Sequence, residues 1–283
     1  MGWLPGWGNK IAGQPFKPTQ RSSWREKHVI DSSKTVTLIN TLKNFIKKHV
    51  AHSAILEKDV VEAYDTWAEN YDTQPGNLML DLDKRVFLEL LDEIVIKNKN
   101  VADIGCGTGR HWGNILKNDP ASLTGFDVSA GMLGKLKNKY PFAQTQLIRD
   151  NLFSAIPDAS FDVILSTLTV AHIKDIEAAL SSWCRICKEK ADIVITDFHP
   201  DALAFGGKRT FPHGKVQISV ENYVHTVRVI KLLLLKNGFR AINEVTKSVD
   251  ETVKDYYRQQ SALHVYEKFK GFPIIYGVHF RRA

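Results

Sequence analysis

The sequence is poor in cysteine and has no long apolar run, and each absence excludes a class of protein. Its 283 residues include only three cysteines, which is too few for the disulfide framework of a small secreted protein. We therefore expect a reduced, cytoplasmic protein. No run of 18 or more apolar residues occurs, so no membrane span is predicted. Cys184 and Cys187 have no second cysteine pair nearby, and we interpret them as packed thiols on one helix rather than a metal site.

Acidic residues are scarce in the first 50 positions, where nine Lys and Arg stand against Glu26 and Asp31. That excess equals the net charge of +7 of the whole chain, so residues 51–283 are electrically balanced. Nucleic-acid enzymes more often carry basic surface around the active site, which makes nucleic acid an unlikely substrate here. Residues 1–35 are predicted to form an irregular basic extension. We expect three of its residues to pack over the active-site mouth or a dimer partner: Trp3, Trp7 and Trp24.

The rest of the chain divides into a helical segment and a larger α/β segment. Residues 36–98 carry apolar stripes of helical period and are predicted to form an entry or cap segment. Residues 99–283 alternate short apolar runs with helical patterns, which predicts a parallel sheet covered by helices on both faces. An insertion at about 200–225 is too long for a minimal loop and is predicted to hold a hairpin on the acceptor side, because connections of this length are usually functional.

Three glycines occupy alternate positions from Gly105 to Gly109, directly after an apolar run. Glycine permits positive φ and leaves no Cβ between the backbone and a ligand, so a strand, this turn and a helix predict a nucleotide-type site. The spacing differs from the Gly-x-Gly-x-x-Gly of dinucleotide sites, since Arg110 stands in place of the third glycine. Asp103 opens the turn, where it would repel a pyrophosphate but attract an amino group. A dehydrogenase is therefore disfavoured.

Acidic residues end three successive predicted strands: Asp103, Asp127 and Asp150. Asp127 follows Gly105 by 22 residues, the position from which a carboxylate accepts ribose hydroxyls. Asp150 lies where it could reach an adenine amino group. The carboxyl ends of parallel strands form the ligand edge of an open α/β sheet, so glycines and acids together predict one ligand site.

Four segments resemble the class I S-adenosylmethionine-dependent methyltransferases, of the small-molecule type that includes the ubiquinone and menaquinone methyltransferases: DIGCGTG (103–109), GFDVSAGML (125–133), RDNLFSAIPDASFDVILS (149–166) and VAHI (170–173). The similarity covers roughly residues 60–200. It implies a Rossmann-like, seven-stranded, mostly parallel sheet whose last strand, here 273–282, runs antiparallel between its neighbours. It also implies S-adenosylmethionine as the cofactor.

The resemblance implies cofactor contacts along the carboxyl edge of the sheet. Gly105 and Gly107 would approach the methionine moiety, Asp103 would lie near its ammonium group, and Asp127 would hold the ribose. The full predicted set is Tyr64, Tyr71, Asp103, Gly105, Gly107, Asp127, Val128, Met132, Asp150, Asn151, Leu152 and Leu168.

The adenine contacts are implied from two sides. Val128 and Met132 would flank the ring, and residues 150–152 would reach its edge. Tyr64 and Tyr71, in the segment YDTWAENYD, resemble residues of the family's entry helix and would close over the cofactor.

Methyl transfer needs a base only where the acceptor must lose a proton. His199 ends a predicted strand two residues after Asp197, and we predict it as the base or an acceptor ligand. His172 is interpreted as a structural or cofactor-side residue, while His213 and His225 could line the acceptor pocket. Three aromatic residues suit an aromatic or lipophilic acceptor: Phe198, Phe205 and Phe211.

We therefore predict a methyltransferase that transfers a methyl group to O, N or C of a small aromatic or lipophilic acceptor, without a metal, as a monomer or homodimer. Two alternatives stay open: an RNA or protein methyltransferase docked by the basic arm, and a non-catalytic S-adenosylmethionine-binding scaffold. An enclosed cavity lined by residues 199–225 and the entry helix would favour small-molecule catalysis. An open basic groove would favour a macromolecular substrate, and a filled acceptor site would favour the scaffold.

Overall fold

The computed structural model describes residues 55–73, 77–205, 208–259 and 263–283. These residues belong to one compact unit, Leu42–Ala283. The predicted extension 1–35, its three tryptophans and the predicted helix that follows it all lie outside the described residues.

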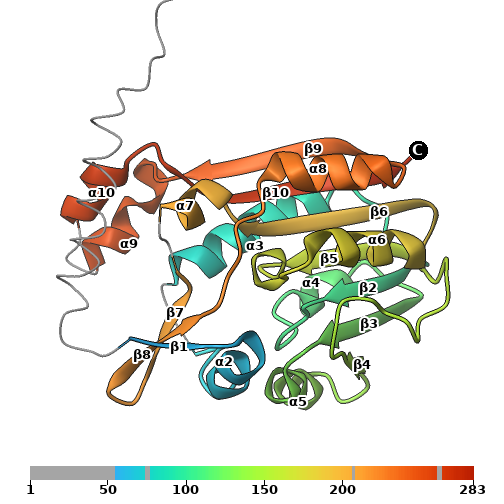
Figure 1. Cartoon of the computed structure of the whole chain (residues 1–283), viewed down its shortest axis with the longest axis horizontal. Coiled ribbons are helices and arrows are strands. Elements are labelled where there is room, and N and C mark those ends of the chain that lie inside the picture. The colour runs from blue at the N-terminus through green and yellow to red at the C-terminus, as the bar shows by residue number, and fades with distance from the viewer. Residues whose placement is uncertain (1–54, 74–76, 206–207, 260–262) are drawn as a thin grey trace, which may run out of the picture. The chain divides into compact units, whose positions relative to one another are not determined.

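A seven-stranded sheet in the order β4-β3-β2-β5-β6-β10-β9 forms the centre of this unit (Figure 1). Neighbouring strands from β4 to β6 are parallel, and β10 runs antiparallel to both β6 and β9. This confirms the predicted Rossmann-like sheet with an antiparallel last strand between its neighbours. The strands are β2 (Asn100–Ile104), β3 (Ser122–Asp127), β4 (Gln144–Leu147), β5 (Phe161–Thr167), β6 (Cys187–Phe198), β9 (Phe239–Ser248) and β10 (Pro273–Arg282).

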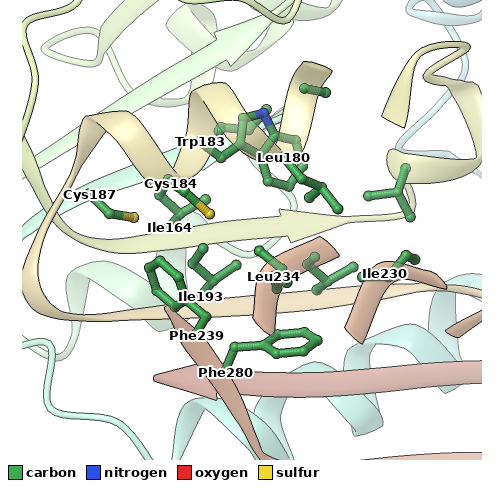
Figure 2. Packing of buried hydrophobic residues seen from close by; sticks show 14 of the residues in the cluster. Ile164, Leu180, Trp183, Cys184, Cys187, Ile193, Ile230, Leu234, Phe239 and Phe280 are labelled. Carbon is green, nitrogen blue, oxygen red and sulfur yellow. The ribbon is translucent and has the colours of Figure 1, made fainter. Parts of the chain in front are cut away.

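The buried stretches of the central strands are mainly apolar, because helices bury both of their faces. Successive side chains of a strand point to opposite faces; thus Ile193 and Ile195 of β6 belong to one buried cluster, and Val194 belongs to the other. Helices α6 (Ile176–Ile186) and α8 (Val227–Lys236) contribute to the first cluster, as Figure 2 shows for Trp183 and Leu234.

The second buried cluster lies under three helices on the opposite face of the sheet: α3 (Leu78–Leu91), α4 (Trp112–Leu116) and α5 (Ala130–Lys139). The chain between β9 and β10 forms short helices, which include α9 (Lys254–Gln259) and α10 (Leu263–Phe269). Of the described helices, none has both the length and the apolar character needed to cross a lipid bilayer.

A smaller sheet of order β1-β8-β7 caps the carboxyl edge of the central sheet (Figure 1). Strands β7 (Thr210–His213) and β8 (Val216–Val220) form the hairpin expected in the insertion, and β8 pairs in parallel with β1 (Ile55–Lys58). Helix α2 (Val60–Trp67) packs on this sheet through Trp67, whose ring stacks on Phe211 at a centroid distance of 4.4 Å. The cap therefore joins the entry segment to the insertion.

Several predicted element boundaries are wrong, each for a local reason. The helical pattern predicted within residues 36–98 is interrupted by a strand: Glu57 and Lys58 pair with β8, Asp59 caps the next helix, and that helix begins at Val60. Helix α8 begins only after Thr226, whose side chain accepts a hydrogen bond from the backbone N–H of Val229. The two thiols do not share one helix, since Cys187 is the first residue of β6.

Helix α3 lies close against β10 because Gly277 has no side chain. A Cβ at this position would lie 2.4 Å from Cγ1 of Val86 and 2.8 Å from Cδ1 of Leu90.

We expect Gly277→Ala to lower the free energy of unfolding by about 1–3 kcal/mol, since overpacking forces neighbours to shift. Urea denaturation followed by circular dichroism measures this. The control is Gly134→Ala in α5, where a Cβ has free space; it should be neutral or stabilising by up to ~1 kcal/mol. Equal effects of the two variants would contradict the close packing.

Candidate active site

A cavity lies between the carboxyl ends of the central strands and the cap. Its empty volume is about 630 Å³, part of which is open solvent. The residues that line it are Val60, Tyr64, Tyr71, Ile104, Gly105, Gly107, Asp127, Val128, Met132, Ile148, Asn151, Thr167, Leu168, Thr169, His172, Ile173 and Arg209. Nine of the twelve predicted cofactor contacts are among them; Asp103, Asp150 and Leu152 are not.

The glycine turn after β2 forms one wall of the cavity. Gly105 has φ +73°, and a Cβ there would lie 2.0 Å from Oγ1 of Thr169, so both the backbone angle and the space require glycine. The N–H groups of Gly105 and Cys106 donate to the carbonyl oxygen of Phe126 at 2.8 and 3.1 Å. Gly107, with φ +53°, has nothing within 4 Å of a Cβ position. The turn therefore presents bare backbone to the cavity.

Asp127 lies at the end of β3 and is largely buried. One carboxylate oxygen accepts the N–H of Gly107 at 2.7 Å, and the other accepts the N–H of Ser129 at 2.9 Å. Burial raises the pKa of Asp127, while these backbone donors act in the opposite direction. A carboxylate has about four acceptor sites, so the group can still accept two hydroxyl hydrogens from the cavity. The arrangement fits a ribose.

Asp103 lies behind the glycine turn and does not line the cavity. It is 5% exposed, and its carboxylate accepts the indole N–H of Trp112 at 2.8 Å. Burial raises the pKa of Asp103 to about 7, although the Trp112 hydrogen bond favours the ionised form. The carboxyl is thus poised to ionise near neutral pH when a cation comes near.

A buried polar cluster centred on Asp83 of α3 binds Arg110 and His111, the two residues that follow the glycine turn. The fully buried carboxylate accepts hydrogen bonds from Arg110, from Nε2 of His111 at 3.0 Å, and from the hydroxyl of Thr196. Burial alone would raise the pKa of Asp83, but the Arg110 charge and these hydrogen bonds outweigh it and hold the pKa well below its usual range. Burial lowers the pKa of His111 to about 4, so His111 is neutral at pH 7.

A second polar cluster lies where the cap meets β5. Nδ1 of His172 lies 2.7 Å from the carbonyl oxygen of Glu221 and therefore carries the proton, which leaves Nε2 to accept from the hydroxyl of Tyr64 at 3.0 Å. Arg209 donates to the Tyr64 oxygen and, at 3.1 Å, to the carbonyl oxygen of Leu168. Burial, aided by the Arg209 charge, lowers the pKa of His172 to about 3. His172 is therefore a neutral acceptor with its lone pair already engaged.

Three predicted site residues have local roles away from the cavity. Asp150 is exposed and accepts the N–H of Leu152 at 2.9 Å, and Leu152 is itself exposed. His199 caps α7 (Pro200–Ala204): its Nδ1 accepts the N–H of Asp201 at 3.3 Å. Of the two strand-end histidines considered from the sequence, His172 and not His199 lines the cavity.

Some of the aromatic and histidine residues predicted for the acceptor pocket pack against other residues, and others lie on the surface. Phe198 lies under the guanidinium of Arg209 at 5.0 Å, whereas Phe205 packs on Phe272. His213 is exposed, and Nε2 of His225 bonds the carbonyl oxygen of Ile173 at 2.7 Å. Sequence analysis missed Arg209 and Thr169; the length of the insertion was the one signal that pointed toward the first of them. In the described part of the chain, no group of three acidic, His or Cys residues could hold a metal.

Comparison with known proteins links this site to methyltransferases. Residues 102–222 match the family model described as "Methyltransferase domain". An O-methyltransferase of Pyrenophora dematioidea is 26% identical over 170 residues, 56% of this chain and 61% of the relative. An uncharacterized methyltransferase of Emericella nidulans is 27% identical over 225 residues, 65% of this chain and 77% of the relative.

A solved structure, a putative S-adenosylmethionine-dependent methyltransferase from Listeria monocytogenes, matches the fold with a TM-score of 0.56 at 20% identity. The match covers 71% of this chain and 98% of that one. These findings confirm the predicted class I S-adenosylmethionine-dependent methyltransferase domain and its cofactor. The ubiquinone and menaquinone subtype stays a prediction.

The Asp83 cluster determines where the glycine turn lies, and its removal tests this. Asp83→Ala leaves the Arg110 charge without its partner, and we expect it to lower the free energy of unfolding at pH 7 by about 3–5 kcal/mol. Because the folded pKa of Asp83 is lowered, its stabilisation is complete above about pH 4 and is lost as the pH falls further. The difference between wild type and variant, measured by urea denaturation, should therefore shrink in acid.

The matched control removes an exposed ion pair. Asp158 is bonded to Arg185 and its side chain is 76% exposed, so Asp158→Ala should cost at most ~1 kcal/mol. A loss of stability in Asp83→Ala no larger than in Asp158→Ala would rule out the anchoring role.

Proposed function

We propose that this protein is an S-adenosylmethionine-dependent methyltransferase that acts on a small aromatic or lipophilic molecule. The observation that carries the proposal is a single cavity lined both by the predicted cofactor contacts and by residues of the cap. The glycine turn, Asp127 and Asn151 lie on the side of the central sheet; Val60, Tyr64 and Arg209 belong to the cap. One partly open cavity shared by two reactants suits methyl transfer, because positioning supplies much of the rate.

The residues present fit the cofactor. Backbone at Gly105 and Gly107 admits close approach, the Asp127 carboxylate faces the cavity with free acceptor sites, and Val128 and Met132 supply apolar surface. S-adenosylmethionine supplies a sulfonium methyl group, which an acceptor lone pair takes while the sulfur keeps the bonding electrons. The chain's own part is to hold both reactants, exclude water and keep the acceptor atom in line.

The lining favours a small acceptor over a macromolecular one. The aromatic residues Tyr64 and Tyr71 and the apolar Ile173 face the cavity beside the glycine turn, which suits an aromatic or lipophilic molecule. The cap from β1 to β8 covers this edge of the sheet, in contrast to the open basic groove expected of an RNA or protein methyltransferase. The relative named an O-methyltransferase favours oxygen among the three candidate atoms. For the oligomeric state, we continue to predict a monomer or a homodimer.

Titration of the cofactor tests the proposal directly. We expect S-adenosylmethionine and S-adenosylhomocysteine to bind wild type with micromolar affinity, and Asp127→Ala to weaken both at least tenfold, since hydrogen bonds to a charged group contribute about 1.5–3 kcal/mol. Isothermal titration calorimetry measures both affinities. The control Asp150→Ala removes an exposed carboxylate outside the cavity and should bind like wild type. Absence of binding to folded wild type would refute the proposal.

The pH dependence of cofactor binding tests the placement of Asp103 near the ammonium group. The raised pKa of about 7 means that the carboxyl takes up a proton on folding and is largely neutral at pH 6. An ammonium group favours the ionised form, so binding releases this proton, and affinity should rise about tenfold from pH 6 to pH 8.

Asp103→Asn cannot ionise and should show a flat profile over this range, as calorimetry at the two pH values would reveal. If wild type and Asp103→Asn have the same pH dependence, Asp103 does not serve the ammonium group.

A further inference from the structure

Arg209 carries a positive charge into the cavity. It precedes β7 in the insertion, is only 8% exposed and lines the cavity beside Leu168 and His172. Its guanidinium donates to the Tyr64 hydroxyl and the Leu168 carbonyl oxygen, and it lies over the ring of Phe198. All of these partners are neutral.

No carboxylate among the described residues lies within ion-pair distance of this guanidinium. Arg110, by contrast, is bonded to the carboxylate of Asp83. Asp197 interacts with the Arg209 charge but makes no ion-pair contact with it; the two Asp197 oxygens accept the N–H groups of Ala171 at 2.9 Å and Phe198 at 2.7 Å. Burial raises the pKa of Asp197 to about 6. A buried charge is costly unless it is paired, and arginine remains charged at any physiological pH.

Among the described residues that line the cavity, none is a free base that could ionise an acceptor. The Nε2 lone pair of His172 is taken by the Tyr64 hydroxyl, and Nδ1 carries the proton that bonds Glu221. Asp127, the acidic residue of the lining, is engaged by backbone N–H groups on the far side of the glycine turn. An acceptor that is already ionised in solution needs no base.

We propose that the acceptor is a carboxylic acid and that Arg209 binds its carboxylate group. This inference rests on the proposed function and specifies the substrate class of the same site. The planar guanidinium matches a planar carboxylate, with which it forms paired, charge-assisted hydrogen bonds. In the described part of the lining, Arg209 is the one charged cation, since His172 is neutral, and a single positive charge balances a carboxylate better than a doubly charged phosphate.

The test measures binding to the protein saturated with S-adenosylhomocysteine. The probes are benzoate and octanoate, each compared with its neutral amide, benzamide and octanamide. We expect at least one acid to bind wild type and raise its midpoint of thermal unfolding, and the matching amide to bind at least tenfold more weakly. Arg209→Gln should lose at least tenfold in affinity for that acid while it keeps its affinity for S-adenosylhomocysteine within about twofold.

Lys208→Gln is the matched control. Lys208 adjoins Arg209 in sequence, but its side chain is 46% exposed and pairs with Glu57 outside the cavity, so this variant should bind the acid like wild type. Equal weakening in both variants would show a general effect of charge and would overturn the assignment.

The remaining outcomes separate this inference from the proposed function. Failure of wild type to bind S-adenosylhomocysteine refutes the proposed function itself. Normal cofactor binding with no preference for either acid over its amide overturns only the carboxylate site. A tenfold loss of S-adenosylhomocysteine affinity in Arg209→Gln would mean that Arg209 serves the carboxylate of the cofactor instead. If Arg209→Gln fails to fold, the acid and its amide are compared on wild type and on Arg209→Lys, which keeps the charge. A preference for the acid in both proteins supports the carboxylate site, and no preference in wild type overturns it.

Discussion

The contact between the glycine turn and the end of β5 is the constraint on which the site depends. Oγ1 of Thr169 occupies the space that a Cβ of Gly105 would need, so the backbone of the turn lies directly against the adjoining parallel strand. Asp127 fixes the other side of the turn through the N–H of Gly107. The three strand ends β2, β3 and β5 thereby form one continuous wall, and a cofactor bound there contacts backbone where another fold would present side chains.

The distribution of buried charge divides this wall into two functions. Arg110 follows the glycine turn, and its charge is paired with the buried carboxylate of Asp83, so it holds the structure together. Arg209 comes from the insertion and has only neutral hydrogen-bond partners among the described residues, which in the proposed site leaves its guanidinium available to an acceptor. Of the carboxylates in the described part of the chain, one is bonded to Arg110 and none to Arg209, so we propose different roles for the two arginines.

The fold and about half of the proposed site could be predicted from the sequence, because both depend on patterns of residues that lie close together along the chain. Strand and helix alternation predicts the sheet, and glycine spacing with Asp127 predicts the cofactor wall. Residues whose position depends on tertiary contacts were not accessible: Asp150 turns outward after β4, and His199 is used as a helix cap.

Arg209 reaches the cavity only because β8 pairs with β1, more than 150 positions earlier in the chain. No periodicity in the insertion reveals such a partner. The boundary errors have the same origin. Thus Glu57 and Lys58 carry helix-compatible side chains, yet pairing with β8 makes them part of a strand.

The cap is fixed at both ends by packing and hydrogen bonds, and this bears on how the proposed site would select its acceptor. On the insertion side, Trp67 stacks on Phe211. On the cofactor side, Asp65 of α2 accepts the hydroxyl of Ser129 at 2.6 Å and the N–H of Gly131 at 2.9 Å. Because α2 is tied both to the wall that holds Asp127 and to the hairpin that carries Arg209, packing among the described residues fixes the distance between the two subsites of the proposed site. In that proposal, an acceptor is selected by its fit to a preformed space and by its charge, and the entropic cost of ordering these residues is met in folding.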